Sequence, residues 1–313
     1  MSKTIILKDE RCIDHITAPG HPESPQRLKS IYNMLKQNDM KGRFKEVAPR
    51  MATKEEISLN HDLKYIDMIE NTAGRSFTSL DGDTNTSAGS WDAALLAVGA
   101  VLDGVDMIME QKADNGFALV RPPGHHAEAS RAMGFCLFNN IAVGAHYLLK
   151  KHDVKKVFII DWDIHHGNGT QNSFYSNPDV FYFSTHQYPY YPGTGAEDER
   201  GTGEGAGYTL NVPLSGGQSD DDYLNIFEEV LEPAIRKFSP EFILVSAGYD
   251  TYFRDPLGTM KVTENGFYRM TEFLKKIAIA DCNGRLFLAL EGGYHIEGIT
   301  ESVKQTILAL SAE

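Results

Sequence analysis

The chain of 313 residues has few cysteines and no long apolar run, and each shortage excludes a class of protein. Its three cysteines (Cys12, Cys136 and Cys282) are far apart in the sequence and cannot form a disulfide framework. We therefore expect a reducing, cytoplasmic location. No apolar stretch approaches the length of about 18 residues that marks a membrane span. The first residues also lack the apolar core and cleavage site of a secretory signal, so we expect no membrane partner.

Basic residues are scarce as well. The chain has 30 Lys and Arg against 43 Asp and Glu, which gives a formal net charge of -13. Binding to nucleic acid needs basic surface to neutralise phosphates, so we expect no direct nucleic-acid partner. An acidic surface is compatible with cationic substrates such as basic peptides or polyamines, and equally with a role in solubility alone.

Short apolar runs alternate with longer segments of helical pattern along the whole chain. Because several runs are apolar on both faces, they indicate buried parallel strands. We therefore predict one domain over residues 1–313, with a mostly parallel sheet covered by helices on both faces. The predicted strands are 4–7, 116–120, 156–161, 179–184, 241–246 and 285–293. The predicted helices are 24–37, 61–72, 90–112, 139–151, 220–237, 264–280 and 296–312.

The segment DWDIHHGNGTQ at 161–171 directly follows a predicted strand, and ligands of such sheets lie beyond the carboxyl ends of strands. In extended backbone Asp161, Asp163 and His165 project to one side. Carboxylate oxygen and imidazole nitrogen suit Zn²⁺, and buried carboxylates are costly without a counter-charge. The other interpretation is a capping and turn network without metal.

Three more segments follow predicted strands. RPPGHHAE at 121–128 carries His125 and His126, and histidine is the natural general acid or base near neutral pH, although adjacent histidines are also common on surfaces. SAGYDTYFRDPLG at 246–258 carries Asp250. Asp250 would be a third protein ligand beside Asp163 and His165, and three ligands leave open the coordination positions that a catalytic zinc needs. In EGGYH at 291–295, Tyr294 offers a phenol that either donates to an oxyanion or is merely packed.

Together these segments resemble the histone deacetylase and acetylpolyamine amidohydrolase superfamily. RPPGHHA, GFCLFNN, DWDIHHGNGTQ, the DPLG that follows Asp250, and EGGY occur in the order of that family. GHPESPQRL at 20–28 is similar to the family's amino-terminal segment. The resemblance extends from about residue 10 to residue 300. Asn168, in a position where other members have Asp, is more similar to class II and bacterial members.

The resemblance implies the arginase/deacetylase fold, with a central parallel sheet of about eight strands. It implies that Asp163, His165 and Asp250 bind one zinc ion, although these ligands do not exclude iron. Two further residues would hold the histidine pair: Asp161 would hold His125, and Asn168 would hold His126. An Asp partner raises a histidine pKa more than a neutral Asn can, so we expect His126 to be the general base, His125 its electrostatic partner and Tyr294 the oxyanion donor.

The resemblance also implies a narrow substrate tunnel. Gly134, Phe135, Tyr191 and Leu257 match its lining positions, and Tyr191 stands where Phe is more usual. Polyamine-selective relatives can carry an acidic residue where this chain has Leu257. Asp83 matches the residue that holds the substrate backbone, but a loop Asp that caps the following helix is the other interpretation.

The resemblance implies two further features, an inner pocket and a structural potassium site near the zinc loop. Arg27 matches an arginine near the inner pocket from which acetate leaves, or it is a helix-surface arginine. A structural potassium ion would be bound by backbone or side-chain atoms of five residues: Asp161, Asp163, His165, Ser184 and Thr185.

The sequence therefore predicts a zinc-dependent hydrolase that removes acetyl or other acyl groups from lysine side chains of proteins or peptides. An acetylpolyamine amidohydrolase and a catalytically silent acyl-lysine binding protein are the alternatives. An arginase-like enzyme would need carboxylates for a second metal, and YDTYFRDP has Thr251 and Tyr252 directly after Asp250. Whether the protein is a monomer or a homodimer stays open.

Overall fold

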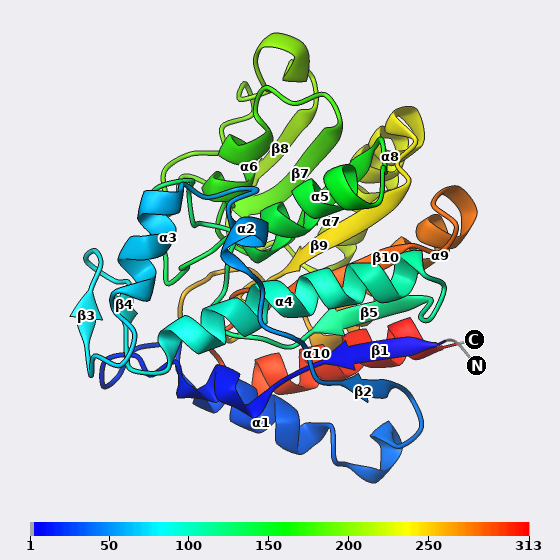
Figure 1. Ribbon diagram of the computed structural model, residues 1–313. Coiled ribbons are helices and arrows are strands. Elements are labelled where there is room, and N and C mark those ends of the chain that lie inside the picture. Colours follow the sequence, from blue (N-terminus) through cyan, green and yellow to red (C-terminus); the bar gives the residue numbers. More distant parts are fainter. Residues whose placement is uncertain (1–2, 313) are drawn as a thin grey trace.

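Eight short strands lie side by side in one sheet, and all of them run in the same direction (Figure 1). The computed structural model describes residues 3–312. In spatial order the strands are β2 (Lys45–Val47), β1 (Thr4–Leu7), β5 (Asn115–Ala118), β10 (Leu286–Leu290), β9 (Phe242–Ala247), β6 (Val157–Asp161), β7 (Val180–Gln187) and β8 (Thr209–Leu214). Two further strands, β3 (Thr78–Ser79) and β4 (Asn85–Thr86), form a separate antiparallel hairpin.

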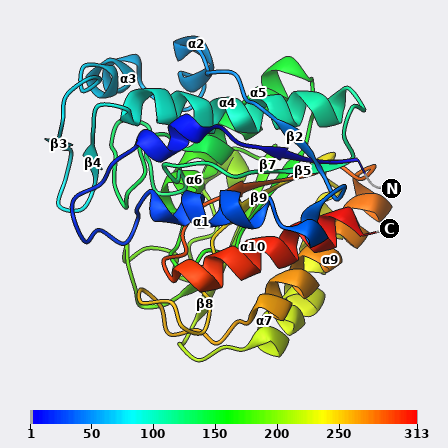
Figure 2. The same cartoon turned by 90° about the horizontal axis from the view of Figure 1, so that it is seen from below.

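Helices cover both faces of this sheet, as the view from below shows (Figure 2). One face carries α4 (Ser90–Met109) and α5 (Asn140–Lys151); the other carries α1 (Gln26–Met34), α9 (Glu264–Asp281) and α10 (Ile296–Ser311). The remaining helices are η1 (Glu10–Asp14), η2 (Asn38–Met40), α2 (Lys54–Ile57), α3 (Leu63–Glu70), α6 (Asn168–Phe174), η3 (Gly203–Gly205), α7 (Asp220–Ile226), η4 (Phe227–Leu231) and α8 (Glu232–Phe238). The predicted fold class is confirmed.

The central strands are apolar because helices cover them on both sides. Every residue of β6 and β9 is buried, including the two polar ones, Asp161 and Ser246. A strand covered on both faces reads as a continuous apolar run, which explains why the sequence located β6 and β9 within one residue. None of the helices within residues 3–312 is both long enough and apolar enough to cross a membrane.

The two strands at the edges of the sheet are not among those predicted from the sequence. Both β2 and β8 are partly exposed and contain polar residues, so neither has the apolar run used to find the others. The predicted helix 220–237 is α7, η4 and α8 in succession, with a widened turn at η4. Helix α6 begins at Asn168, inside a segment interpreted as an active-site loop.

Helix α4 approaches the sheet closely where it crosses β10. Gly104 lies so near Phe287 that a Cβ atom at this glycine would sit 2.1 Å from the ring. Phe287 is fully buried, and it also packs over Gly116 of β5. The ring therefore fills the space that two glycines leave open.

We expect Phe287→Ala to lower the free energy of unfolding by about 3–5 kcal/mol, because it leaves a cavity at the centre of the sheet. Phe77→Ala is the matched control, since this ring is 55% exposed, and it should change stability by less than about 0.5 kcal/mol. Urea unfolding followed by circular dichroism measures both. A similar cost for both variants would contradict this view of the core.

Candidate active site

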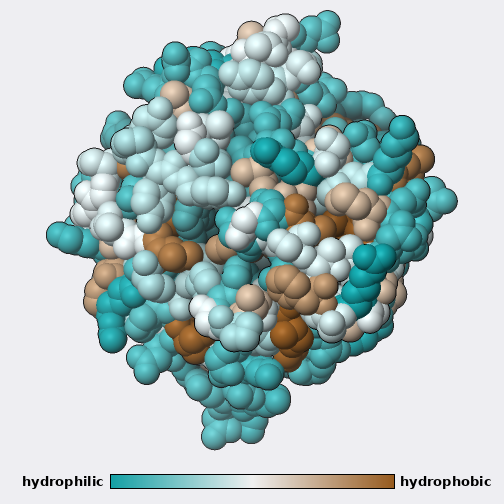
Figure 3. All heavy atoms as spheres, turned by 90° about the vertical axis from the view of Figure 1, so that its left-hand side faces the viewer, coloured by the Kyte–Doolittle hydropathy of each residue, from teal (hydrophilic) through white to brown (hydrophobic). Residues whose placement is uncertain are grey.

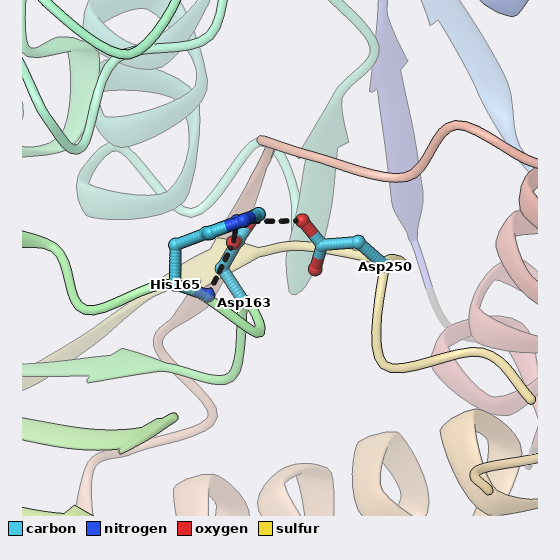
Figure 4. Close-up of side chains that lie close together, drawn as sticks. All are labelled: Asp163, His165 and Asp250. Carbon is cyan, nitrogen blue, oxygen red and sulfur yellow. Dashed lines mark hydrogen bonds and ion pairs between the residues drawn. The ribbon is translucent and has the colours of Figure 1, made fainter. Parts of the chain in front are cut away.

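Two buried carboxylates and one imidazole converge at the carboxyl ends of β6 and β9 (Figure 4). The Nδ1 atom of His165 lies 3.0 Å from Asp163 Oδ1 and 3.1 Å from Asp250 Oδ2. One potential ligand atom from each residue lies within 4.8 Å of the others. The free oxygens are held by backbone amides, because Gly292 N–H donates to Asp163 and Ile164 N–H donates to Asp250. The sequence-predicted metal ligands are therefore brought together.

The chemistry of this group suits a divalent cation. Asp163 and Asp250 are completely buried, and burial together with the charge of Asp163 raises the pKa of Asp250 to about 7. Two neighbouring buried carboxylates repel each other unless a positive charge lies between them. Two oxygens and one nitrogen are the donors that zinc accepts in catalytic sites. Within residues 3–312 this is the one group found with such a geometry.

Beside this cluster, His125 pairs with a carboxylate. Its Nδ1 lies 3.0 Å from Asp161 Oδ2, and its Nε2 lies 3.8 Å from Asp163 Oδ1. Asp161 also accepts a hydrogen bond from the hydroxyl of Tyr182. The imidazole is thus fixed by an anion on its far side while its other nitrogen faces the cluster.

The second histidine pairs with a neutral amide. His126 Nδ1 lies 2.8 Å from Asn168 Oδ1, and Asn168 Nδ2 donates to Glu128 Oε1 over 2.9 Å. A carboxylate only accepts hydrogen bonds, so the NH₂ group of Asn168 must face Glu128. The amide oxygen of Asn168 then faces His126. Nδ1 of His126 therefore carries the proton, and Nε2 of the neutral ring has a free lone pair.

The pKa values of the two histidines are shifted in opposite directions. Burial alone lowers the pKa of His125, but the Asp161 and Asp163 carboxylates outweigh it and raise the pKa to about 10. Burial lowers the pKa of His126 well below its ordinary value, and the neighbouring His125 and His165 lower it further. The anionic partner of His125 therefore keeps this histidine protonated, whereas the neutral partner of His126 leaves that histidine able to accept a proton.

A small pocket of about 230 Å³ leads to these groups. This volume is below the usual range for drug-sized ligands, so it suits one slim side chain. Its wall contains the predicted tunnel residues together with Tyr190, which the sequence analysis did not identify. The lining is Asp83, His126, Gly134, Phe135, His165, Tyr190, Tyr191, Leu257 and Tyr294.

The walls rest directly on the polar groups at the base. The ring of Phe135 meets Tyr294 edge to face at 5.9 Å, and Tyr191 meets His126 in the same way at 5.1 Å. Gly134 has a positive φ of 55°, and a Cβ atom there would lie 2.3 Å from the His126 ring. Only glycine lets this wall approach the histidine so closely.

The structure decides two of the open interpretations. Arg27 is fully buried and is therefore not a helix-surface residue; its guanidinium group lies 5.1 Å from the centre of the Tyr294 ring and pairs with Glu23. Asp83 lies between β3 and β4, where its carboxylate accepts from Thr84, so it does not cap a helix.

Three of the five predicted potassium ligands, Asp161, Ser184 and Thr185, lie on the neighbouring strands β6 and β7, and the other two lie in the loop after β6. Asp161 of β6 is the register partner of Ser184 of β7, and Ser184 and Thr185 are buried. The potassium ion itself stays a prediction.

Two carboxylates escaped the sequence analysis. Glu128 orients Asn168 as described above. Glu291 is fully buried, and it accepts from the backbone of Gly124 at 2.6 Å and of His125 at 3.2 Å. Glu128 belongs to the motif RPPGHHAE and Glu291 to the motif EGGYH. Their place inside these motifs was the signal by which both could have been predicted as site residues.

Residues 21–310 match the histone deacetylase domain family. The chain belongs to this family. The match covers every strand of the sheet except β1, and it includes every predicted site residue, so it agrees with the family predicted from the motifs.

Several members are similar over nearly all of this chain. A probable deacetylase from Archaeoglobus fulgidus is 38% identical over 311 residues, which cover 99% of this chain and 86% of that protein. A protein named polyamine deacetylase HDAC10, from Danio rerio, is 38% identical over 92% of this chain and 44% of its own length. The crystal structure of the HDA15 HD domain superposes with a TM-score of 0.95 at 41% identity, covering all of this chain and 89% of the other.

The cluster generates a direct prediction about metal content. Asp250→Asn removes one anionic ligand while it keeps the size of the side chain, so bound divalent metal should fall from about one per chain by at least about 10-fold. Inductively coupled plasma mass spectrometry after dialysis measures this. Asp103→Asn, on the remote helix α4, is the control and should retain the metal. Equal metal content in both variants would contradict the assignment.

Proposed function

We propose that this protein is a zinc-dependent hydrolase that removes acetyl or other acyl groups from lysine side chains of proteins or peptides. One observation carries the proposal: a slim pocket with aromatic walls ends at a group of two aspartates and a histidine. His126 and Tyr294 border the same pocket. The family and the similarity to a probable deacetylase support it.

The chain's own residues supply the remaining chemistry. When bound, zinc would polarise the acyl carbonyl and lower the pKa of the attacking water. His126 presents an unprotonated Nε2, so it accepts the proton of that water and later transfers it to the leaving amine. Tyr294 donates a hydrogen bond from its phenol to the negative charge that develops on the carbonyl oxygen as water adds to the acyl carbon. His125, fixed by Asp161, keeps a positive charge beside the developing anion.

The walls favour a lysine stem over more polar chains. Phe135, Tyr191 and Leu257 give the pocket apolar surface of the kind that methylene groups prefer. The amide of an acylated lysine carries no charge. Its desolvation at the bottom of the pocket therefore costs less than that of the charged ammonium group of an unmodified lysine.

An acetylpolyamine is the second candidate substrate. The carboxylate of Asp83 lies on the pocket wall, and the chain carries a net charge of -13, so a cationic tail outside the pocket would be attracted. The face on which the strands end is mostly hydrophilic, with separate small apolar patches (Figure 3). This surface is compatible with a polyamine as well as with a peptide.

A side-by-side assay separates the two substrates. Acetate release from an acetyl-lysine peptide and from an acetylated polyamine should be measured with zinc-loaded protein, with His126→Ala as the inactive control. We expect the peptide to be the better substrate by kcat/KM. Faster polyamine cleavage would overturn the substrate but keep the chemistry. Zinc binding without cleavage of either would favour the silent binding protein.

A second prediction concerns the phenol. Tyr294→Phe should lower kcat by about 10²–10³-fold, because it removes one oxyanion donor. Bound zinc should stay near one per chain, since this residue is not a ligand in the cluster. Steady-state kinetics with a parallel metal analysis checks both. A loss of less than about 3-fold would remove Tyr294 from the mechanism.

A further inference from the structure

One buried carboxylate joins the two loops that carry the candidate metal ligand Asp250 and the candidate oxyanion donor Tyr294. Asp255 is 6% exposed and lies five residues beyond Asp250 in the loop after β9. Its Oδ2 accepts from Tyr294 N–H at 2.6 Å and from His295 N–H at 3.1 Å. Its Oδ1 accepts from Leu257 N–H at 2.9 Å, within its own loop.

Three donors around one side chain require a carboxylate. An asparagine at this position has a single acceptor oxygen, so its NH₂ group would face at least one of the backbone N–H groups. A buried N–H group without an acceptor is costly, and one of the two loops would have to move. Asp255 is therefore matched to this junction by its charge and not only by its size.

The backbone before Tyr294 needs such anchoring because it contains two glycines. Gly293 has a φ of 118°, a conformation that only glycine adopts readily, and Gly292 approaches Asp163 and Asp250 too closely for a Cβ atom. Arg27 holds this segment from the other side, through the carbonyl groups of Glu291 and Gly293. The N–H group of Tyr294 itself is held by Asp255.

We propose that Asp255 is a positioning residue: its carboxylate fixes the backbone of Tyr294 against the Leu257 loop and so sets where the phenol stands in the pocket. This rests on the proposed function, because the phenol acts only if the acyl group is hydrolysed there. It assigns no contact between Asp255 and substrate. The same carboxylate ties the oxyanion donor to the pocket wall, so the two move together.

A double-mutant cycle tests this role. Asp255→Ala should lower kcat about 10- to 100-fold, with KM changed by less than about 3-fold. In the Tyr294→Phe background the same change should cost less than about 3-fold, because the positioned hydroxyl is already absent. Bound zinc should stay near one per chain. Asp255→Asn, which keeps part of the junction, should fall between wild type and Asp255→Ala.

Asp220→Ala is the matched control. Asp220 also joins two elements, since it accepts from the backbone and hydroxyl of Thr263 at the start of α9, and it is not among the residues that line the pocket. We expect it to leave kcat within about 2-fold of wild type. Equal losses from Asp255→Ala in the wild-type and Tyr294→Phe backgrounds, or loss of zinc, would overturn the proposal.

A readout without turnover separates this proposal from the proposed function. With 3-fluorotyrosine at position 294, the ¹⁹F resonance should shift or broaden in Asp255→Ala and Asp255→Asn, and stay unchanged in Asp220→Ala. An unchanged resonance in both Asp255 variants would overturn the positioning role even in an active enzyme. If the wild-type protein binds zinc but cleaves no acyl substrate, the proposed hydrolase function is refuted. The ¹⁹F shift would still report whether Asp255 positions the side chain of Tyr294.

Discussion

Buried carboxylates at the ends of the parallel strands are the constraint on which the site depends. Asp163, Asp250 and Glu291 are fully buried, and each must be compensated or it would destabilise the fold. Part of the compensation comes from backbone N–H groups of neighbouring loops, such as Gly292 to Asp163 and Gly124 to Glu291. The carboxylates therefore hold the loops in place as well as providing ligands.

This arrangement explains why glycine occurs at the closest points. Gly292 donates to Asp163, and a Cβ atom there would lie 2.3 Å from Asp250 Oδ2. Gly134 brings the Phe135 wall against His126 in the same way. A larger side chain at either position would push a loop away from the charge that it stabilises or from the ring that it supports.

Charge also divides the histidine pair. Both rings are buried among similar neighbours, and they differ in the partner at Nδ1: a carboxylate for His125 and an amide for His126. The amide is itself oriented by Glu128. A chain of three residues therefore sets the proton position on the histidine that faces the pocket.

The motifs predicted the family and the metal ligands, and the apolar runs that alternate with helical segments predicted the parallel sheet. A strand that is covered on both faces can be recognised in the sequence because nearly all its residues are apolar. Since the strands are parallel, the residues that follow them all lie at the same edge of the sheet. The exposed edge strands β2 and β8 lack that signal and were missed.

What the sequence could not decide was which motifs become neighbours. The loops after β5, β10, β9 and β6 meet because these strands are adjacent in that order, which differs from their order along the chain. This order brings Asp255 to Tyr294 and Glu291 to His125. The packing of α1 places the guanidinium group of Arg27 5.1 Å from the centre of the Tyr294 ring. Arg27 also donates to the carbonyl of Gly293, 266 positions along the chain, and local pattern carries no information on pairs so distant.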